Sequence, residues 1–418
     1  MRLNSIQLKN FRGFEHCAFD LHPQMTVLVG PNASGKTAIC EGITVAIEAV
    51  PWHAGLQVAG IRSPYLRRYR RNSEGLVFLE VAQPTSVEAT GHVLGIDCTW
   101  TRSRNGLARR TNRGGLGAIS AALTAGLASS GATNSWPVVA AFDTFRLQGD
   151  RGRVKAAKNV GSRLRAYEDC FAPLDSFDRQ LSWLRHQTYA AVQSGGPTIH
   201  LETVLRVLVE CLPQASNVYF SIQEEQLVVQ FADGGSADFD SLSAGYRAIV
   251  SVVADIAWRC VVLNAHLGAR APTESKGVVV IDEIDLHLHP IWQRRVLADL
   301  MRTFPKIQFV VTTHSPQVLA SCQPEWLRVL AADGQVQQVP YVHGWDSNTV
   351  LRDIMGDEAR PAFMLANLAA VTEAIHAGHW LQAEAQIEQL AQELGPQSVE
   401  VVRARMDLAF ERQVGDDA

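Results

Sequence analysis

The sequence predicts an α/β fold whose central sheet is assembled from both ends of the chain. One observation is a glycine-rich loop at Gly30–Thr37, which an apolar strand precedes and a helical pattern follows. The other is a second apolar strand, at 278–281, that ends in Asp282 and Glu283. With 418 residues, 47% hydrophobic and 19% charged, the chain is long and apolar enough to bury a large core and to divide into subdomains.

The first strands, the loop and a helix occupy residues 1–50. Apolar positions predict strands over 3–8 and 25–29. The spacing of apolar residues from Thr37 onward predicts a helix, which Pro51 ends. The loop reads Gly-Pro-Asn-Ala-Ser-Gly-Lys-Thr and matches the P-loop pattern G-x-x-x-x-G-K-[ST] in the strand–loop–helix context that this pattern requires. A chance glycine-rich turn is the alternative, and the context argues against it.

The P-loop residues have the chemistry of a phosphate site. Glycines at 30 and 35 let backbone N–H groups face an anion without a Cβ in the way, and the helix that starts near Lys36 points its positive dipole end at the same place. Lys36 would contact the β- and γ-phosphates, and the Thr37 hydroxyl would ligate Mg²⁺. The predicted cofactors are therefore ATP and Mg²⁺. The predicted ATP-binding residues of the loop are Gly30, Pro31, Asn32, Ala33, Ser34, Gly35, Lys36 and Thr37.

The middle of the chain adds a basic region and then a helical one. Residues 52–74 read as a basic loop, and strands are predicted at 76–81 and 93–101. Residues 102–135, rich in Arg, Gly, Ala and Ser, predict a loop around one Ala-rich helix, which a buried strand follows. The spacing becomes helical from 162 to 212, so we expect an α-helical insertion there.

The C-terminal half returns to strands alternating with helices. Two short strands are predicted between 218 and 231, and a helix runs from Leu242–Arg247 to about residue 263. A strand at 308–312 leads to His314. The chain beyond Trp345 reads as a helical tail.

Three residues are predicted to be catalytic. Glu283 and His314 lie in the C-terminal half, and Lys36 lies in the P-loop. Asp282, at the end of a buried strand, can hold Mg²⁺, and Glu283 beside it can accept a proton from the attacking water. A solvated turn is the alternative for an Asp-Glu pair, but the preceding aliphatic residues would bury these carboxylates, which is costly without a cation. His314 can hydrogen-bond a γ-phosphate, although a lone histidine is more often structural.

The segment Leu242–Arg247 places Ser243 directly before a helix. A simple N-cap is one interpretation, because serine supplies this role routinely. The other interpretation is that the Ser243 hydroxyl and the Gly245 amide bind the γ-phosphate held by a second copy of the chain.

Taken together, these segments resemble the ATP-binding-cassette (ABC) ATPase heads of the SMC and RecF type, over 1–50 and 236–320. The resemblance implies a homodimer or larger oligomer in which two protomers sandwich two ATP molecules, each site using Ser243 and Gly245 of the other protomer. It also matches Asn10–Phe14 to the group's N-terminal strand and turn, which implies a nucleotide contact for Arg12. The organisation it implies is ATPase lobe I at 1–150, a helical insertion at 151–215, lobe II at 216–345 and a helical tail at 346–418.

Within that group, Ile281–Pro290 and Thr312–Gln317 look most like the bacterial antiphage-defence ATPases of the OLD, Septu and retron PtuA-like types. OLD proteins carry a TOPRIM nuclease, whose clustered acids the sequence after Trp345 does not show. A nuclease effector would therefore be a separate polypeptide. The glutamine that binds Mg²⁺ in such heads is best matched by Gln148, with Gln83 as the alternative.

Charge and composition limit the kinds of partner that the sequence predicts. Lys and Arg outnumber Asp and Glu in residues 1–170, and the reverse holds in the remainder. A basic half suggests an anionic partner such as DNA or another nucleic acid, with Arg62–Arg71 as one candidate site, and a solvated basic loop is the equal alternative. Seven cysteines without a C-x-x-C pair, and no apolar run near ~20 residues, predict a cytoplasmic protein that does not associate with membranes.

Two other functional classes stay open. A RecF-like DNA-repair ATPase would bind DNA through its basic half. A nucleotide-gated scaffold would instead hold an effector nuclease inactive and hydrolyse ATP slowly. A transporter ATPase is disfavoured, because the long insertion and the helical tail are not features of transporters.

Overall fold

The structure is a computed structural model, and it divides the chain into two compact units, Met1–Val350 and Leu351–Ala418, each described by itself. It describes residues 1–73, 76–106, 111–112, 114–129, 135–144, 163–171, 176–331, 334–338, 344–345, 347–355 and 362–416.

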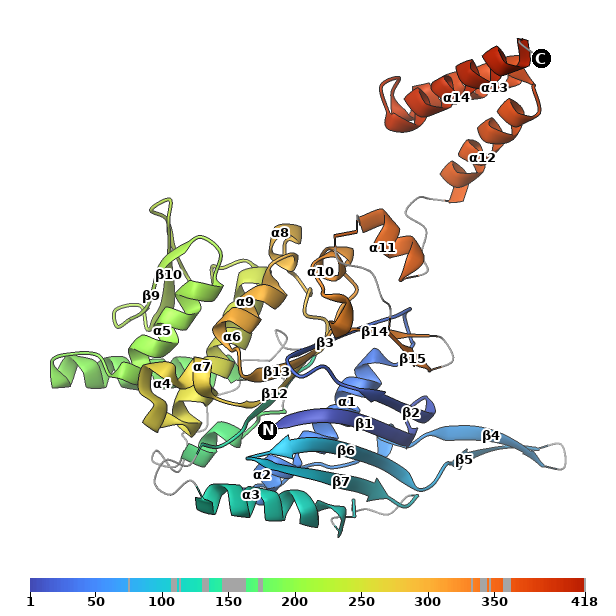
Figure 1. The fold of residues 1–418 in the computed structure, drawn as a ribbon. Coiled ribbons are helices and arrows are strands. Elements are labelled where there is room, and N and C mark those ends of the chain that lie inside the picture. Colours follow the sequence, from blue (N-terminus) through green and yellow to red (C-terminus); the bar gives the residue numbers. More distant parts are fainter. Residues whose placement is uncertain are drawn as a thin grey trace. The chain divides into compact units, whose positions relative to one another are not determined.

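A six-stranded sheet forms the centre of the first unit, in the order β15-β14-β3-β13-β12-β8 (Figure 1). The five strands from β14 to β8 are parallel to their neighbours, and β15 pairs antiparallel with β14. Every residue of β3, β12 and β13 is buried, which explains their continuous apolar sequences. The strand bounds are β3 Met25–Val29, β8 Val138–Phe142, β12 Gly277–Ile281, β13 Ile307–Thr312, β14 Leu327–Leu330 and β15 Val336–Gln337.

The strand order brings the two ends of the chain together. The P-loop follows β3, Asp282 follows β12, and β13 lies between these two strands. Because all three strands run parallel, the segments that follow them emerge at the same edge of the sheet, where ligands bind in open α/β sheets. The predicted α/β class, with a P-loop sheet built from N- and C-terminal strands, is confirmed.

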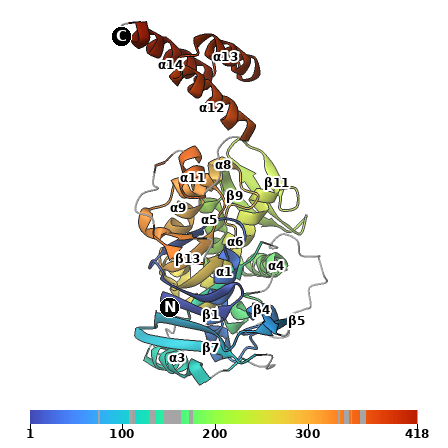
Figure 2. The same ribbon diagram turned by 90° about the vertical axis from the view of Figure 1, so that its right-hand side faces the viewer.

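An antiparallel sheet in the order β2-β1-β6-β7 accompanies the central sheet. Its strands are β1 Arg2–Phe11, β2 Phe14–Asp20, β6 Thr85–Val93 and β7 Ile96–Arg104, and helix α3 Gly117–Ser129 lies beside β7 (Figure 2). The strand predicted over 93–101 is β7, which begins later, at Ile96, because residues 94–95 form the turn between β6 and β7. The strand β6 was missed because its buried positions include Thr85, Ala89 and Gly91, which are too small or too polar to give a clear apolar alternation.

Helix α1, Lys36–Ile47, follows the P-loop and is packed against both sheets. The indole N–H of Trp100, on β7, donates to the carbonyl of Ala46 over 3.0 Å and ties the antiparallel sheet to this helix. The expected stop at Pro51 is not observed, since a short helix α2, Ala49–His53, contains this proline. The first helix ends before this proline, at Ile47, and Glu48 lies between α1 and α2.

Strands β4, Arg68–Ser73, and β5, Leu76–Val81, form a separate two-stranded ribbon. Part of the region predicted as a basic loop, 52–74, is therefore a strand. Its run of arginines hides the alternation that normally indicates a strand. Figure 1 shows the ribbon extending away from the antiparallel sheet.

The helical insertion and the C-terminal half supply the remaining elements of the first unit. A buried ion pair within α6 joins Arg259 Nε to Asp255 Oδ2 over 2.6 Å, and Gln180 of α4 donates to the same carboxylate, so these two helices are held together. The elements are α4 Ser176–Ser194, α5 Ile199–Cys211, β9 Ala215–Ser221, β10 Gln226–Phe231, β11 Ser236–Asp238, α6 Ala244–Leu263, α7 Ala271–Glu274, α8 Pro290–Gln293, α9 Val296–Thr303, α10 Pro316–Ala320 and α11 Ser347–Asp353.

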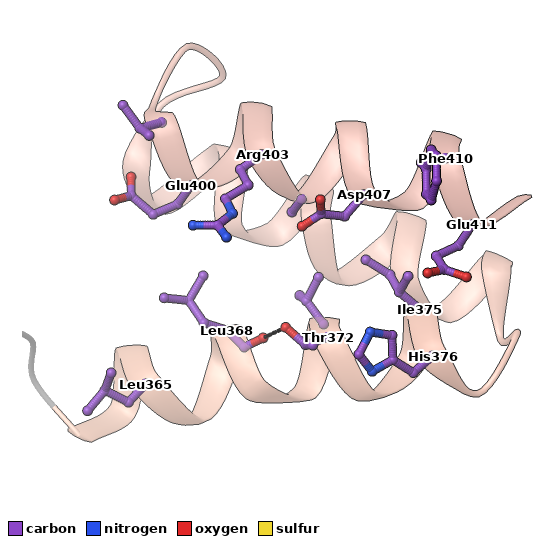
Figure 3. A pocket seen from close by; sticks show the side chains of 13 residues that line it. Leu365, Leu368, Thr372, Ile375, His376, Glu400, Arg403, Asp407, Phe410 and Glu411 are labelled. Atoms are coloured by element: carbon purple, nitrogen blue, oxygen red, sulfur yellow. Dashed lines mark hydrogen bonds between the residues drawn. The ribbon is translucent and has the colours of Figure 1, made fainter.

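The second unit is the predicted helical tail. It consists of α12 Ala362–His376, α13 Trp380–Leu394 and α14 Val399–Asp416, around a small core of its own. A groove of about 610 Å³ lies between α12 and α14, where Leu368 and Ile375 face Arg403 and Asp407 (Figure 3). None of the predicted site residues lines this groove. Among the described residues, no helix combines the length and apolarity that a bilayer crossing requires.

Candidate active site

The backbone of the P-loop is possible only with glycine at its two ends. Gly35 has a φ of 100° and precedes the first residue of α1, and a Cβ there would lie 2.4 Å from Cζ of Phe14. A Cβ on Gly30 would lie 2.5 Å from the carbonyl oxygen of Leu330, on β14. The loop is therefore held tightly between β2 and β14, with its backbone fixed around the start of α1.

Two side chains of the loop are buried where an anion would be received. The hydroxyl of Ser34 is buried and has no hydrogen-bond partner among the described residues. Lys36 is 6% exposed and donates from Nζ to the carbonyls of Gly30 (2.8 Å) and Pro31 (2.9 Å). A buried polar group without a partner costs free energy, so the unsatisfied hydroxyl fits a site that a phosphate oxygen completes.

Two opposing effects act on the pKa of the Lys36 ammonium. Burial lowers its pKa, and the carboxylates of Asp282, Glu283 and Asp285 act in the opposite direction. The same carboxylates would repel a bare polyphosphate. A cation is therefore needed if phosphate and acids are to share the site.

The residues predicted as metal ligands meet across the sheet. Thr37, at the start of α1, donates from Oγ1 to Oδ2 of Asp282 over 2.8 Å, although 245 residues separate them. Two oxygens bound to adjacent positions of an octahedral Mg²⁺ lie about 3.0 Å apart, given Mg–O distances near 2.1 Å. Thr37 and Asp282 thus fit two neighbouring ligand positions. No group of three or more His, Cys, Asp or Glu side chains that could hold a metal occurs in the described part of the chain.

Thr312, at the end of β13, connects the two acids. Its hydroxyl donates to Oδ1 of Asp282 over 2.5 Å and accepts a hydrogen bond of 2.7 Å from the backbone N–H of Glu283. Glu283 has a left-handed φ of 50°, so the backbone changes direction directly after Asp282. This bridging role of Thr312 is not evident from the sequence.

A second hydrogen-bonded group fixes the segment around His314. Asp285 accepts from the Thr313 hydroxyl over 2.6 Å and from the backbone N–H of His314 over 3.3 Å. The hydroxyl of Ser315 donates to Oε1 of Gln293 over 2.7 Å. The half-buried imidazole of His314 has no hydrogen-bond or ion-pair partner among the described residues, so it is available to a ligand.

Asp285 and Gln293 were also missed by sequence reasoning. Asp285 lies only two residues after Glu283, and Thr313 directly precedes His314, so the signal was present in the two motifs. What the sequence does not provide is the pairing of these two segments across neighbouring strands.

Ser243 begins α6 as an N-cap, and its side chain accepts a hydrogen bond of 3.4 Å from the N–H of Tyr246. The capping interpretation is therefore confirmed, while the contact with a second copy stays a prediction. Gly245 lies against the loop that follows Glu283, since a Cβ there would be 2.5 Å from the carbonyl oxygen of His287. The rings of Tyr246 and Trp292 meet edge to face at 4.3 Å beside this contact.

The remaining predicted ligands are not brought to the site by contacts within the described residues. Arg12 forms a bidentate hydrogen-bonded ion pair with Glu41 of α1, and its guanidinium lies 5.1 Å from the ring centroid of Tyr65. Its nucleotide contact stays a prediction. Gln148 lies outside the described residues, and Gln83 is an exposed residue between β5 and β6.

Comparisons with known proteins agree with this site. A protein-family model described as "AAA ATPase domain" matches residues 1–48, and one described as "AAA domain, putative AbiEii toxin, Type IV TA system" matches 263–320. The first stretch contains the P-loop, and the second contains Asp282, Glu283 and His314. The two matched stretches are thus the ones that the fold brings together.

Individual relatives cover parts of the chain. A retron Ec83 probable ATPase of Escherichia coli is 34% identical over 189 residues, which are 45% of this chain and 34% of that protein. Septu protein PtuA of Bacillus thuringiensis is 30% identical over 155 residues, 35% of this chain and 38% of that protein. The DNA replication and repair protein RecF of Staphylococcus epidermidis is 46% identical over 43 residues, 10% of this chain and 12% of that protein.

Among solved structures, an SMC head domain from Thermotoga maritima covers 82% of this chain and 100% of that one, with 18% identity and a TM-score of 0.42. An Smc head bound to the C-terminal winged-helix domain of ScpA covers 81% and 98%, with 16% identity and a TM-score of 0.47. The chain spans less than two fifths of the length of the retron and Septu relatives that it matches. The predicted resemblance of this chain to the retron and Septu PtuA ATPases, within the SMC- and RecF-like group, is thereby confirmed.

Proposed function

We propose that the chain is a Mg²⁺-dependent ATPase whose sites are completed by a second copy of itself. The observation that carries the proposal is the hydrogen bond between Thr37 and Asp282, which joins the P-loop helix to the acid strand beside the buried Lys36. The matches to ATPase family models at both of these segments support it.

Each residue of the site has a defined task in this proposal. The P-loop amides, the Ser34 hydroxyl and Lys36 bind the phosphates, while Thr37 and Asp282 hold Mg²⁺, which when bound neutralises charge on the β- and γ-phosphates. Glu283 accepts the proton of the attacking water. His314, anchored through Asp285, donates a hydrogen bond to the γ-phosphate.

The requirement for a second copy rests on the position of Ser243. No hydrogen bond links Ser243 to the P-loop among the described residues, and its side chain is exposed at the start of α6. An exposed serine and a helix N-terminus together offer donors to an anion that the same chain does not supply. Two copies facing each other would complete two sites in a two-fold dimer.

Mixed dimers test this arrangement. Lys36→Ala and Ser243→Arg are each expected to abolish turnover alone. After the two variants are mixed and re-paired, turnover should recover to about a quarter of the wild-type value, since half of the dimers are mixed and each mixed dimer holds one intact site. Activity should require Mg²⁺ and disappear with a chelator. Full activity of Ser243→Arg alone would contradict the shared site, and turnover in the chelator would contradict the role of Mg²⁺.

We further propose a role in bacterial antiphage defence together with a separate effector nuclease. The similarity to retron and Septu proteins supports this role. A tagged chain purified from its host is expected to bring down a distinct nuclease, while the isolated chain leaves DNA intact. Metal-dependent DNA cleavage by the isolated chain would contradict the division of labour.

A further inference from the structure

The β4–β5 ribbon separates its side chains into two chemically different faces. In the antiparallel register Tyr69 is opposite Glu80 and Arg71 is opposite Phe78, so these four residues share one face. Arg68, Arg70 and Asn72 occupy the other face, with Val81, Leu79 and Val77 opposite them in that order. We call this second set the arginine face.

The first face is neutralised within the ribbon. Glu80 accepts from the Tyr69 hydroxyl over 2.8 Å and forms an ion pair of 3.3 Å with Arg71. Arg67, just before the ribbon, pairs with Glu15 over 3.2 Å. The four arginines at 67, 68, 70 and 71 are therefore not equivalent.

The arginine face carries positive charge that no acidic side chain in the described part of the chain balances. Neither Arg68 nor Arg70 has an ion-pair or hydrogen-bond partner among the described residues, both are exposed, and the face holds no acidic residue. Val77 and Leu79 beside them are 64% and 62% exposed. The face continues through Arg68 into an open groove of about 480 Å³, lined by Arg12, Ser63, Pro64, Leu66 and Arg68.

We propose that the arginine face binds the phosphate backbone of duplex DNA, with the ribbon lying along a groove of the duplex. A major groove about 12 Å wide admits a two-stranded β-ribbon, and arginine is well suited to phosphate. Arg68 and Arg70 lie about 7 Å apart along the strand, which lets them reach separate phosphates of one backbone. The aliphatic side chains between them suit apolar contact with thymine methyl groups.

A protein partner fits this face less well. Stable protein interfaces bury roughly 800 Å² on each partner and have few charged residues at their centre. The arginine face offers three aliphatic side chains, and two arginines without a partner among the described residues lie opposite two of them. This composition favours a polyanion.

The test compares the two faces of the same ribbon. Binding of a short labelled duplex to the full chain is measured by fluorescence anisotropy over a range of salt concentrations. Arg68→Ala/Arg70→Ala is expected to weaken binding roughly tenfold at low salt and to reduce the slope of log K against log [salt] by about 2, one for each lost phosphate contact. Arg71→Ala, on the neutralised face, should keep the wild-type slope.

Equal losses in the two variants, or no duplex binding by the wild-type chain, would overturn the proposal. So would binding to phosphatidylserine vesicles that the double variant abolishes while duplex binding persists. Melting curves confirm folding, and Arg70→Glu replaces the double variant if that protein does not melt cooperatively. The proposal is independent of the ATPase, since ATP turnover without DNA should be unchanged in Arg68→Ala/Arg70→Ala.

Discussion

Replacing Glu283 by glutamine is expected to leave ATP binding intact and to slow hydrolysis by about 10²–10⁴-fold, the range that a general base contributes. The amide has the shape of the carboxyl group but cannot accept a proton from water. The backbone N–H of residue 283 can still donate to Thr312, so the turn after Asp282 should keep its geometry. Single-turnover hydrolysis and equilibrium nucleotide binding, measured on the same preparation, separate the two effects.

Glu274→Gln is the matched control for this prediction. Glu274 is an acid of α7 that pairs with Lys306 at the surface, so its replacement should change neither binding nor turnover. If Glu283→Gln hydrolysed ATP at the wild-type rate, another group would have to be the base. If Glu283→Gln failed to bind ATP, Glu283 would be needed to form the nucleotide site and not specifically to accept the proton.

The parts of the fold that could be predicted from sequence are those encoded in continuous stretches. The P-loop and β12 carry their own patterns, because a glycine loop and an all-apolar strand leave few alternatives. The ribbon β4–β5 was missed in part because its stability does not come from an apolar face. Arginines on a strand that stays exposed give no period-2 signal.

The order of strands in the central sheet is not encoded locally. Neither β3 nor β12 indicates that β13 lies between them, and without that fact the sequence cannot place Thr312 against both Asp282 and Glu283. The same holds for Asp285, whose partners Thr313 and His314 arrive from the neighbouring strand. The motifs predict which residues bind phosphate and metal. The hydrogen bonds that hold those residues in place depend on how the strands pair, which the motifs do not predict.

Gly245 has a packing role within the chain in addition to its predicted contact with a nucleotide. Its lack of a side chain lets the start of α6 approach the carbonyl of His287, in the loop that follows Glu283. The exposed Ser243 and the proposed base are thereby connected through one packed backbone contact. A ligand held at the start of α6 would therefore lie close to the loop that follows the proposed base, Glu283.

Among the residues that support the site, we expect the replacement of Thr312 to reduce stability and activity most. Thr312→Val keeps the shape of the side chain but removes the hydroxyl that donates to Asp282 and accepts from the N–H of Glu283. Losing these two hydrogen bonds should cost roughly 1–3 kcal/mol in the free energy of unfolding, measured by urea denaturation. Activity should fall about 10–100-fold, as when a residue that orients a metal ligand is lost.

Two further variants distinguish a specific role of this hydroxyl from a general loss of stability. Thr312→Ser keeps the hydroxyl and should restore most of the turnover. Thr203→Val removes a buried hydroxyl that donates only to the carbonyl of Ile199 within α5, so it should leave turnover unchanged. Wild-type activity in Thr312→Val would show that Asp282 and Glu283 hold their positions without this bridge. A loss confined to Thr312→Val, measured well below its unfolding midpoint, would mean that the strand between the two motifs positions both acids.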